Sequence, residues 1–524
     1  MNKKSFLCLL GILLLEYLFI FTFLLNYDLA WMNSEKFGVR HWMLSNGPHW
    51  QTEDWSKFLN INVIEDNPYR LSRPLSNFIE VVDAKWRASL WQSATPHPAL
   101  SIQWPFMFIL LPWLLYQTFV NLGVLPFVAL TGVCVYVATA GFLGPLVMLF
   151  HPAKNLANFF GVLSMYFFSI NYKLLPNAGK KQSGGALLAG YLALFLGFFS
   201  DETGIYLYMV TLLLFHRMWL QWWNEKRYMF LSGLLVLPLL YFISIKFLLP
   251  YWHWLYSGSW IHLDQYESYP SLKTLLWPDK FFFWQNTQFL FADHPHLLIN
   301  YKQLSAYPVI FTIQIVYVLA ALALVFMFFK ALIKTDAQQK IFFVMFLAGF
   351  LLMGGYCFFQ TFQLSENAKA WGVWWYGSLF SFLFIFPLVF FLQIIFSRYE
   401  QVSKWGLIIA FIFVLNGMTF TTYRLAIFKL QNLNRSAYSF MGIFKGMVDP
   451  YQSFSFHKAL ERSYCKKMYA HLYWRHWKNL PDDVDPVQRD KCFSGPLAAD
   501  FYFMTEENGY LPSELNYSDS PKSQ

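Results

Sequence analysis

Two adjacent carboxylates, Asp201 and Glu202, lie in the stretch FFSDETGIYL, between two long apolar segments. Acidic groups at a membrane surface can belong to a reaction site or can bind a metal ion. They can equally form the polar turn of a helical hairpin, which Gly204 would help to bend. The two interpretations require different surroundings, so the elements that position this turn decide between them.

Two arginines, Arg70 and Arg73, precede a segment with helical periodicity in NPYRLSRPLSNFIEVVDAKWRASLW. After Pro74, which suits a first helical turn, apolar residues recur at helical spacing from Leu75 to Leu90, and the charged residues lie largely off this stripe. The pattern predicts an amphipathic helix at the membrane interface. Guanidinium groups beside the free amides of a helix N-terminus suit a phosphate group. Nonspecific contact with lipid headgroups is the alternative reading of the same residues.

The composition indicates an integral membrane protein. Of 524 residues, 56% are hydrophobic, 21% are aromatic and only 13% are charged, whereas about 25% of the residues of a soluble domain are charged. Apolar runs long enough to cross about 30 Å of hydrocarbon recur along the chain, and each must be a helix because lipid offers no partner for backbone amides. We therefore expect an all-α integral membrane protein with about eleven transmembrane helices. The predicted spans are residues 5–25, 105–122, 124–150, 156–175, 184–200, 204–222, 228–250, 306–330, 340–360, 374–396 and 405–424.

Basic residues orient these spans, since short cytoplasmic loops are enriched in Lys and Arg. With a cytoplasmic N-terminus, every informative cytoplasmic connection is basic. The residues concerned are Lys173, Lys180, Lys181, Arg217, Lys226, Arg227, Lys330, Lys334, Lys340, Arg398 and Lys404. The connection at 121–123 is uncharged, and an error there would invert every later segment. On this topology the outer loops are 26–104, 200–204, 251–305 and 361–373, and they include Asp201 and Arg73. The net charge of +9 reflects the cytoplasmic loops, and we expect no nucleic acid partner.

The layout resembles the GT-C superfamily of membrane glycosyltransferases. YRLSRPLSNF, residues 69–78, is similar to the SYRPL-like loops of the transmembrane O-mannosyltransferase branch. SDETGI, residues 200–205, is similar to the KETG-like turn of the same branch, with Asp201 where those relatives usually have Lys. The resemblance implies juxtamembrane helices in the first outer loop and a catalytic acid soon after the first span. It also implies transfer of a sugar from a polyprenyl-phosphate carrier to an acceptor on the extracytoplasmic face.

Such a transfer needs a carboxylate that takes the acceptor proton, cations that balance the leaving phosphate, and an apolar groove for the carrier. The resemblance favours Asp28, directly after the first span, as the base. The candidate catalytic acids are Asp28, Asp54, Asp66, Asp201 and Glu202. The candidate phosphate ligands are Arg70, Arg73, His253, His262 and Lys369.

A metal site is left open by the sequence. No HExxH motif or paired CxxC spacing typical of zinc is present. The carboxylates of Asp28, Asp201 and Glu202 could bind a hard divalent ion, or could act without one. The resemblance implies a polyprenyl-phosphate sugar as the donor substrate.

Residues 1–424 are predicted to form the membrane module, and residues 425–524 a small outward-facing module with a disordered end. Two cysteines of this tail, Cys465 and Cys492, would form a disulfide in an oxidising compartment. The expected location is a bacterial inner membrane with the site facing the periplasm. The expected partners are membrane lipids and a glycan, lipid or protein acceptor. Two alternatives remain: a transporter or flippase of lipid-linked sugars, and a Wzy-like polymerase or ligase.

Overall fold

A computed structural model describes the helical body of the chain. The described residues are 7, 9–15, 17–18, 73–76, 78–79, 82–83, 86, 101–139, 141–142, 152–173, 184–201, 203–257, 319, 322–333, 337–363 and 373–398. Their regular secondary structure is entirely helical, as the composition predicts. Among the described residues, three helices are long and apolar enough to cross a membrane: Tyr228–Trp252, Gln339–Cys357 and Ser378–Phe396. The count of eleven spans stays a prediction, because much of the chain lies outside the described residues.

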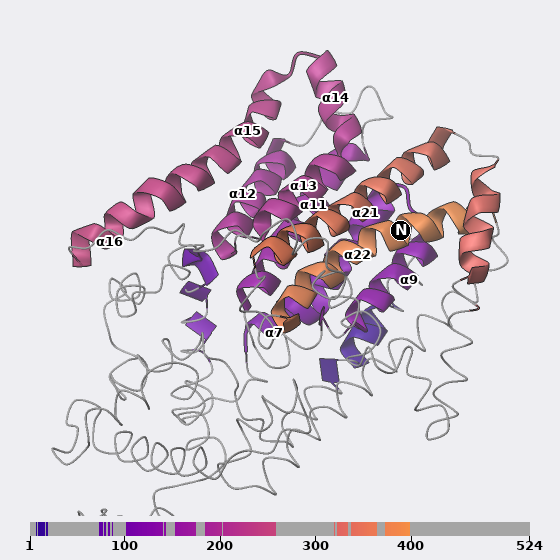
Figure 1. Cartoon of the computed structure of the whole chain (residues 1–524), viewed down its shortest axis with the longest axis horizontal. Coiled ribbons are helices and arrows are strands. Elements are labelled where there is room, and N and C mark those ends of the chain that lie inside the picture. The colour runs from indigo at the N-terminus through magenta and orange to yellow at the C-terminus, as the bar shows by residue number, and fades with distance from the viewer. Residues whose placement is uncertain are drawn as a thin grey trace, which may run out of the picture.

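The bundle is built from helices that follow the predicted apolar runs (Figure 1). One helical rod joins α7 (Gln103–Pro105), the π-helical turn η3 (Phe106–Leu110) and α8 (Leu111–Asn121). Another joins α15 (Tyr228–Ile243), the π-helical turn η4 (Ser244–Leu248) and α16 (Leu249–Ser257). The other helices are α9 (Pro126–Val137), α11 (Pro152–Tyr172), α12 (Gly184–Ser200), α13 (Gly204–Leu214), α14 (His216–Asn224), α21 (Ala337–Gln363) and α22 (Val373–Phe396).

Each π-helical turn ends two residues before a proline, Pro112 after η3 and Pro250 after η4. A proline has no N–H to donate, and its ring clashes with the carbonyl four residues earlier. The widened turn accommodates both defects without ending the helix. The two rods therefore remain continuous across their prolines.

Two predicted spans are not single helices. The run predicted at 204–222 is broken at Phe215, where α13 ends and α14 begins. The run predicted at 124–150 is interrupted after α9, because Thr139 donates its hydroxyl to the Tyr136 carbonyl at 2.7 Å and accepts the Phe142 N–H at 3.2 Å. A threonine side chain bonded to nearby backbone competes with the helical ladder. Both predictions of one uninterrupted helix are wrong in their described parts.

The uncharged connection after α8 is a true turn between two helices. Gly123 adopts a φ of 89°, a conformation that favours glycine. The N–H of Leu125 then donates to Oε1 of Gln393 on α22 at 2.9 Å, which ties this turn to the end of a distant helix. The structure therefore separates the predicted spans 105–122 and 124–150 at the uncharged connection 121–123.

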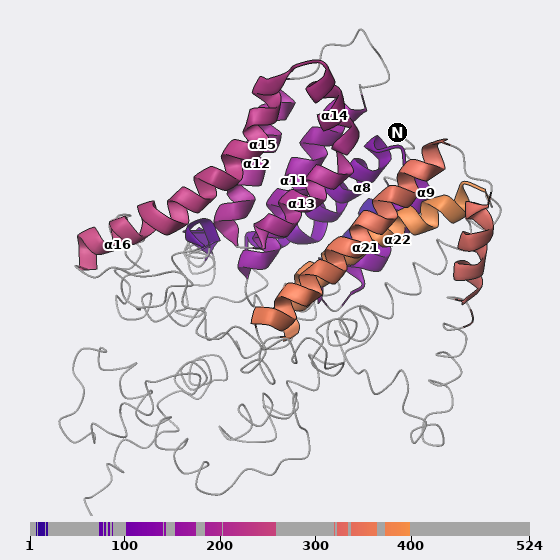
Figure 2. The same ribbon diagram turned by 45° about the horizontal axis from the view of Figure 1, so that its top comes forward.

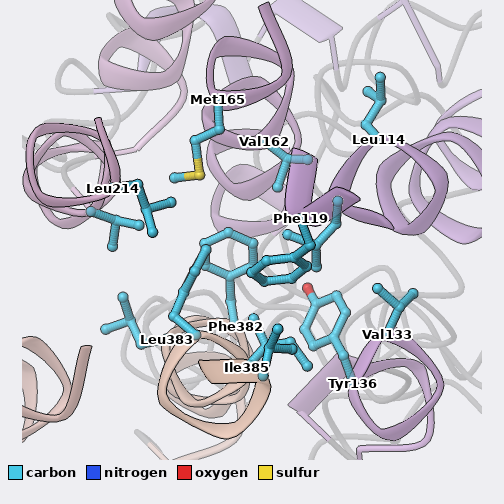
Figure 3. Packing of buried hydrophobic residues seen from close by; sticks show 14 of the residues in the cluster. Leu114, Phe119, Val133, Tyr136, Val162, Met165, Leu214, Phe382, Leu383 and Ile385 are labelled. Atoms are coloured by element: carbon cyan, nitrogen blue, oxygen red, sulfur yellow. The ribbon is translucent and has the colours of Figure 1, made fainter. Parts of the chain in front are cut away.

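The core lies around α11, which packs against α8, α12, α13 and α22. Next to this packing, Figure 3 shows Phe119 of α8, Tyr136 of α9, and Phe382 and Ile385 of α22 converging, and each is almost fully buried. In contrast, α15 projects along one edge of the bundle in Figure 2 and exposes many large apolar side chains. An apolar helix surface of this kind suits contact with lipid.

The two ends of the bundle differ in chemistry. At the Asp201 end, the start of α11, the end of α12 and the start of α22 are joined by polar contacts. At the opposite end, which we call the Lys173 end, Asn121 of α8 donates to Ser169 of α11 at 3.0 Å. Exposed basic residues, all predicted to be cytoplasmic, lie at helix ends or in connections at this Lys173 end. They are Lys173, Arg217, Lys226, Arg227, Lys330, Lys340 and Arg398. The described helices thus alternate in direction as the distribution of charge predicts.

Candidate functional site

A buried ion cluster lies at the Asp201 end. Nε of Arg73 lies 3.0 Å from Oδ2 of Asp201, and Nζ of Lys154 lies 3.2 Å from Oδ1 of the same carboxylate. The side chains of Asp201 and Lys154 are 0% and 2% exposed, and that of Arg73 is 11% exposed. Two cations from distant parts of the sequence therefore converge on one carboxylate away from water.

The turn that carries Asp201 is fixed by its own backbone. Oδ1 of Asp201 accepts the Thr203 N–H at 2.9 Å, and the Asp201 carbonyl accepts the Gly204 N–H at 2.9 Å. A Cβ atom added at Gly204 would lie 2.9 Å from the Gly197 carbonyl oxygen and 3.0 Å from the Phe198 Cα. Only glycine fits here, because backbone atoms cannot move aside as a side chain can. The turn is both polar and close-packed, so it is more than a solvated hairpin.

The two cations of the cluster lie at the N-terminal ends of two helices. Arg73 directly precedes Pro74, which begins the predicted amphipathic helix, and Lys154 lies in the first turn of α11. Sequence reasoning did not single out Lys154. A signal was present, since Lys154 lies in a connection that the topology places outside, where basic residues are less frequent. Its partner could not be read from the sequence because the contact joins residues 47 positions apart.

The electrostatics of the cluster keep Asp201 charged. Burial alone would raise the pKa of the Asp201 carboxyl, but Arg73, Lys154 and the Thr203 N–H together lower this pKa well below its ordinary value. An ionised carboxylate that holds two cations is a weak proton acceptor near neutral pH. The cluster therefore suits Asp201 to hold cations in place better than to act as a general base.

The predicted amphipathic helix is anchored by a polar residue. Oδ1 of Asp83 accepts the Ser101 hydroxyl at 2.8 Å and the Ile102 N–H at 2.7 Å, and Asp83 is 0% exposed. Phe78 and Trp86 are instead 45% and 47% exposed. The helix thus buries part of its polar side against the start of α7 and leaves two aromatic side chains outward. Exposed aromatic residues of this kind are typical of a membrane interface.

A second polar group lies next to Lys154 on α11. Ser378 of α22 donates its hydroxyl to Oδ1 of Asn155 at 2.7 Å and accepts Nδ2 of Asn158 at 3.2 Å. All three residues are at least nine-tenths buried. Sequence reasoning missed this group as well, because isolated Asn and Ser residues in apolar runs give no periodic signal.

The structure brings together two of the predicted site residues, Arg73 and Asp201. His253 lies in α16. Outside the described residues lie Asp28, Asp54, Asp66, Glu202, Arg70, His262, Lys369, Cys465, Cys492 and the tail module 425–524. Within the described part of the chain, no group of three His, Cys, Asp or Glu side chains is placed to hold a metal ion.

Comparison with protein-family models, with curated proteins and with solved structures gives no match for this chain.

Proposed function

We propose that this protein is a membrane glycosyltransferase of the GT-C type, which transfers a sugar from a polyprenyl-phosphate carrier to an acceptor outside the cytoplasm. One observation carries the proposal. The two short segments that resemble GT-C motifs are joined by the contact between Arg73 and Asp201, at the place where Lys154 adds a second cation.

The cluster supplies what the leaving group needs. When the acceptor oxygen attacks the anomeric carbon, the bond between that carbon and the phosphate oxygen breaks, and the phosphate leaves with the electron pair. Cations that are already held in a site with little water stabilise this developing charge without reorganising. In this proposal Arg73 and Lys154 bind the phosphate, and Asp201 fixes both of them.

The proton of the acceptor hydroxyl must go to a different group, because Asp201 is occupied by its two cations. The acids Asp28, Asp54, Asp66 and Glu202 remain the candidates for this base. Asp28 keeps the leading place that the resemblance gives it.

The surroundings of the cluster also suit a lipid carrier. The helix that begins after Arg73 exposes Phe78 and Trp86. A small apolar pocket lies between α13 and the pair α21 and α22, with Val210, Leu214 and Met345 among its lining residues. Because Val210 lies on α13, which begins at Gly204 just after Asp201, this pocket is a few helical turns from the cluster. The exposed aromatic side chains offer an apolar surface for the isoprenoid chain of a carrier whose phosphate is held at the cluster.

Comparison of lipid-linked sugars between cells with and without the gene tests the proposal, since it identifies donor and acceptor together. If the protein is a glycosyltransferase, the sugar-bearing carrier should accumulate in cells without the gene. The purified protein should also cleave the sugar–phosphate bond in detergent. A flippase moves the carrier between the two leaflets of a bilayer and leaves its sugar–phosphate bond intact. A detergent micelle has no leaflets, so a flippase would not change the carrier there. If folded protein leaves the carrier uncleaved with the acceptor present, the result would therefore favour the transporter.

A further inference from the structure

The polar group made by Asn155, Asn158 and Ser378 has a hydrogen-bonding capacity that the described residues do not satisfy. Oδ1 of Asn158 is buried and has no hydrogen-bond partner within the described part of the chain. Asn158 is 1% exposed. Leaving a buried polar atom without a partner destabilises the fold, so its presence beside a candidate site requires an explanation.

The same group lies within reach of the ion cluster. Asn158 follows Lys154 by four residues, so the two side chains share one face of α11 and are separated by about 6 Å of axial rise. Asn155 is the next residue after Lys154, and Ser378 joins both asparagines to the start of α22. The first two turns of α11 therefore present a buried polar arc that begins at a cation of the cluster.

The chemistry of this arc favours a hydroxyl-bearing ligand. A hydroxyl both donates and accepts, so it satisfies the open position of Asn158 whichever way the amide is turned. A metal ion or an ammonium group is disfavoured because Lys154 is adjacent. An apolar chain would leave the amide unsatisfied.

We propose that Asn158, supported by Asn155 and Ser378, binds a hydroxyl of the donor sugar while its phosphate lies at Arg73 and Lys154. This inference deepens the proposed function and rests on it. It assigns Asn158 to recognition of the sugar and the ion cluster to recognition of the phosphate. The phosphate and the sugar of one donor molecule would thus be bound by the ion cluster and by the neighbouring polar group.

The test compares carriers with and without a sugar. Purified protein in nanodiscs is titrated with polyprenyl phosphate and with polyprenyl phosphate bearing mannose, glucose, galactose or arabinose. Wild type should bind at least one sugar-bearing carrier more tightly than the bare carrier. In Asn158→Leu, the affinity for the sugar-bearing carrier relative to the bare carrier should fall about tenfold, the scale of one or two hydrogen bonds. The affinity of this variant for the bare carrier should equal that of wild type.

Two further variants keep the result interpretable. Asn121→Leu removes a similar amide that bonds a serine of α11 at the Lys173 end, and it should keep the full gain from the sugar. Ser378→Ala removes only the hydroxyl between the two asparagines and should reproduce the loss seen for Asn158→Leu. If folded Asn158→Leu retains the gain, or if no sugar improves binding to wild type, the inference is overturned while phosphate binding stands. If the bare carrier does not bind wild type at all, the proposed function itself fails.

Discussion

The carboxylate of Asp201 is engaged on both oxygens, by Arg73 on one side and by Lys154 and the Thr203 N–H on the other. Buried charges of this kind are stable only as a set, because each cation loses its counter-charge when the carboxylate is removed. At the scale of single residues, the site therefore depends on Asp201 for its geometry. In the proposed reaction, the acceptor proton would go to another acid.

Replacing Asp201 with Asn tests this division of roles. We expect Asp201→Asn to destabilise the protein by about 3–5 kcal/mol, because two buried cations lose their partner. The lowered pKa of Asp201 means that its contribution is complete above the ordinary carboxyl pKa of about 4 and is lost as the pH falls below that value. The stability difference from wild type should therefore be constant between about pH 6 and pH 8.

The pH profile of transfer separates a positioning role from a basic role. If Asp201 positions the cations, Asp201→Asn lowers the rate and raises the donor KM, but the acid limb of the profile is unchanged. Loss of the acid limb in a folded variant would instead identify Asp201 as the base.

At the scale of elements, the turn between α12 and α13 determines where Asp201 lies. Gly204→Ala should destabilise the protein by about 1–3 kcal/mol and should reduce activity, because its Cβ would press on the backbone at Gly197 and Phe198. The matched control is Gly197→Ala, whose Cβ would meet its nearest neighbour at 3.7 Å, an ordinary contact. Thermal unfolding of the two purified variants gives the comparison, and equal stability would show that the turn tolerates the change.

The amphipathic helix is a second element whose position affects the site. Asp83→Ala removes the acceptor of the Ser101 hydroxyl and the Ile102 N–H, and it should cost about 1–3 kcal/mol. We expect a raised donor KM as well, because Arg73 precedes the same helix. Glu225→Ala is the control, since its ion pair with Arg227 is more than one-third exposed and should contribute little. Equal effects of the two substitutions on stability and KM would contradict the anchoring role.

Local pattern predicted some parts of this arrangement and not others. Apolar runs and basic loops predicted the helices and their alternating directions, because lipid imposes a requirement that each segment must meet by itself. The break at Phe215 and the interruption at Thr139 depend on local backbone bonding within runs that remain apolar. Periodicity placed Asp83 off the apolar stripe, yet this residue is buried by a partner in a different segment.

The candidate site shows the same limit. Arg73 and Asp201 were recognised because each lies in a motif, whereas Lys154, Asn155 and Asn158 lie in an apolar helix without one. Their importance comes from contacts between distant segments, and no feature of the nearby sequence specifies such contacts. The three-dimensional structure was needed to join them.

At the scale of the whole molecule, the polar contacts at the Asp201 end and the exposed basic residues at the Lys173 end predict opposite sides of the membrane. Alkaline phosphatase fused after residue 202 should be active, because this enzyme needs an oxidising compartment, and the same enzyme fused after residue 173 should be inactive. The reverse pattern would place the site in the cytoplasm and would exclude an extracytoplasmic reaction.

The central claim is that the cluster of Arg73, Lys154 and Asp201 binds the phosphate of a lipid-linked sugar during transfer. Once the donor is known, the most direct measurement is the cleavage rate of that donor by purified Lys154→Met in detergent. The matched control is Lys173→Met, which removes an exposed ammonium at the other end of α11. We predict that Lys154→Met lowers the rate about 10²-fold, the scale of lost electrostatic stabilisation, while Lys173→Met retains the wild-type rate. A folded Lys154→Met protein that cleaves the donor as fast as wild type would contradict the claim.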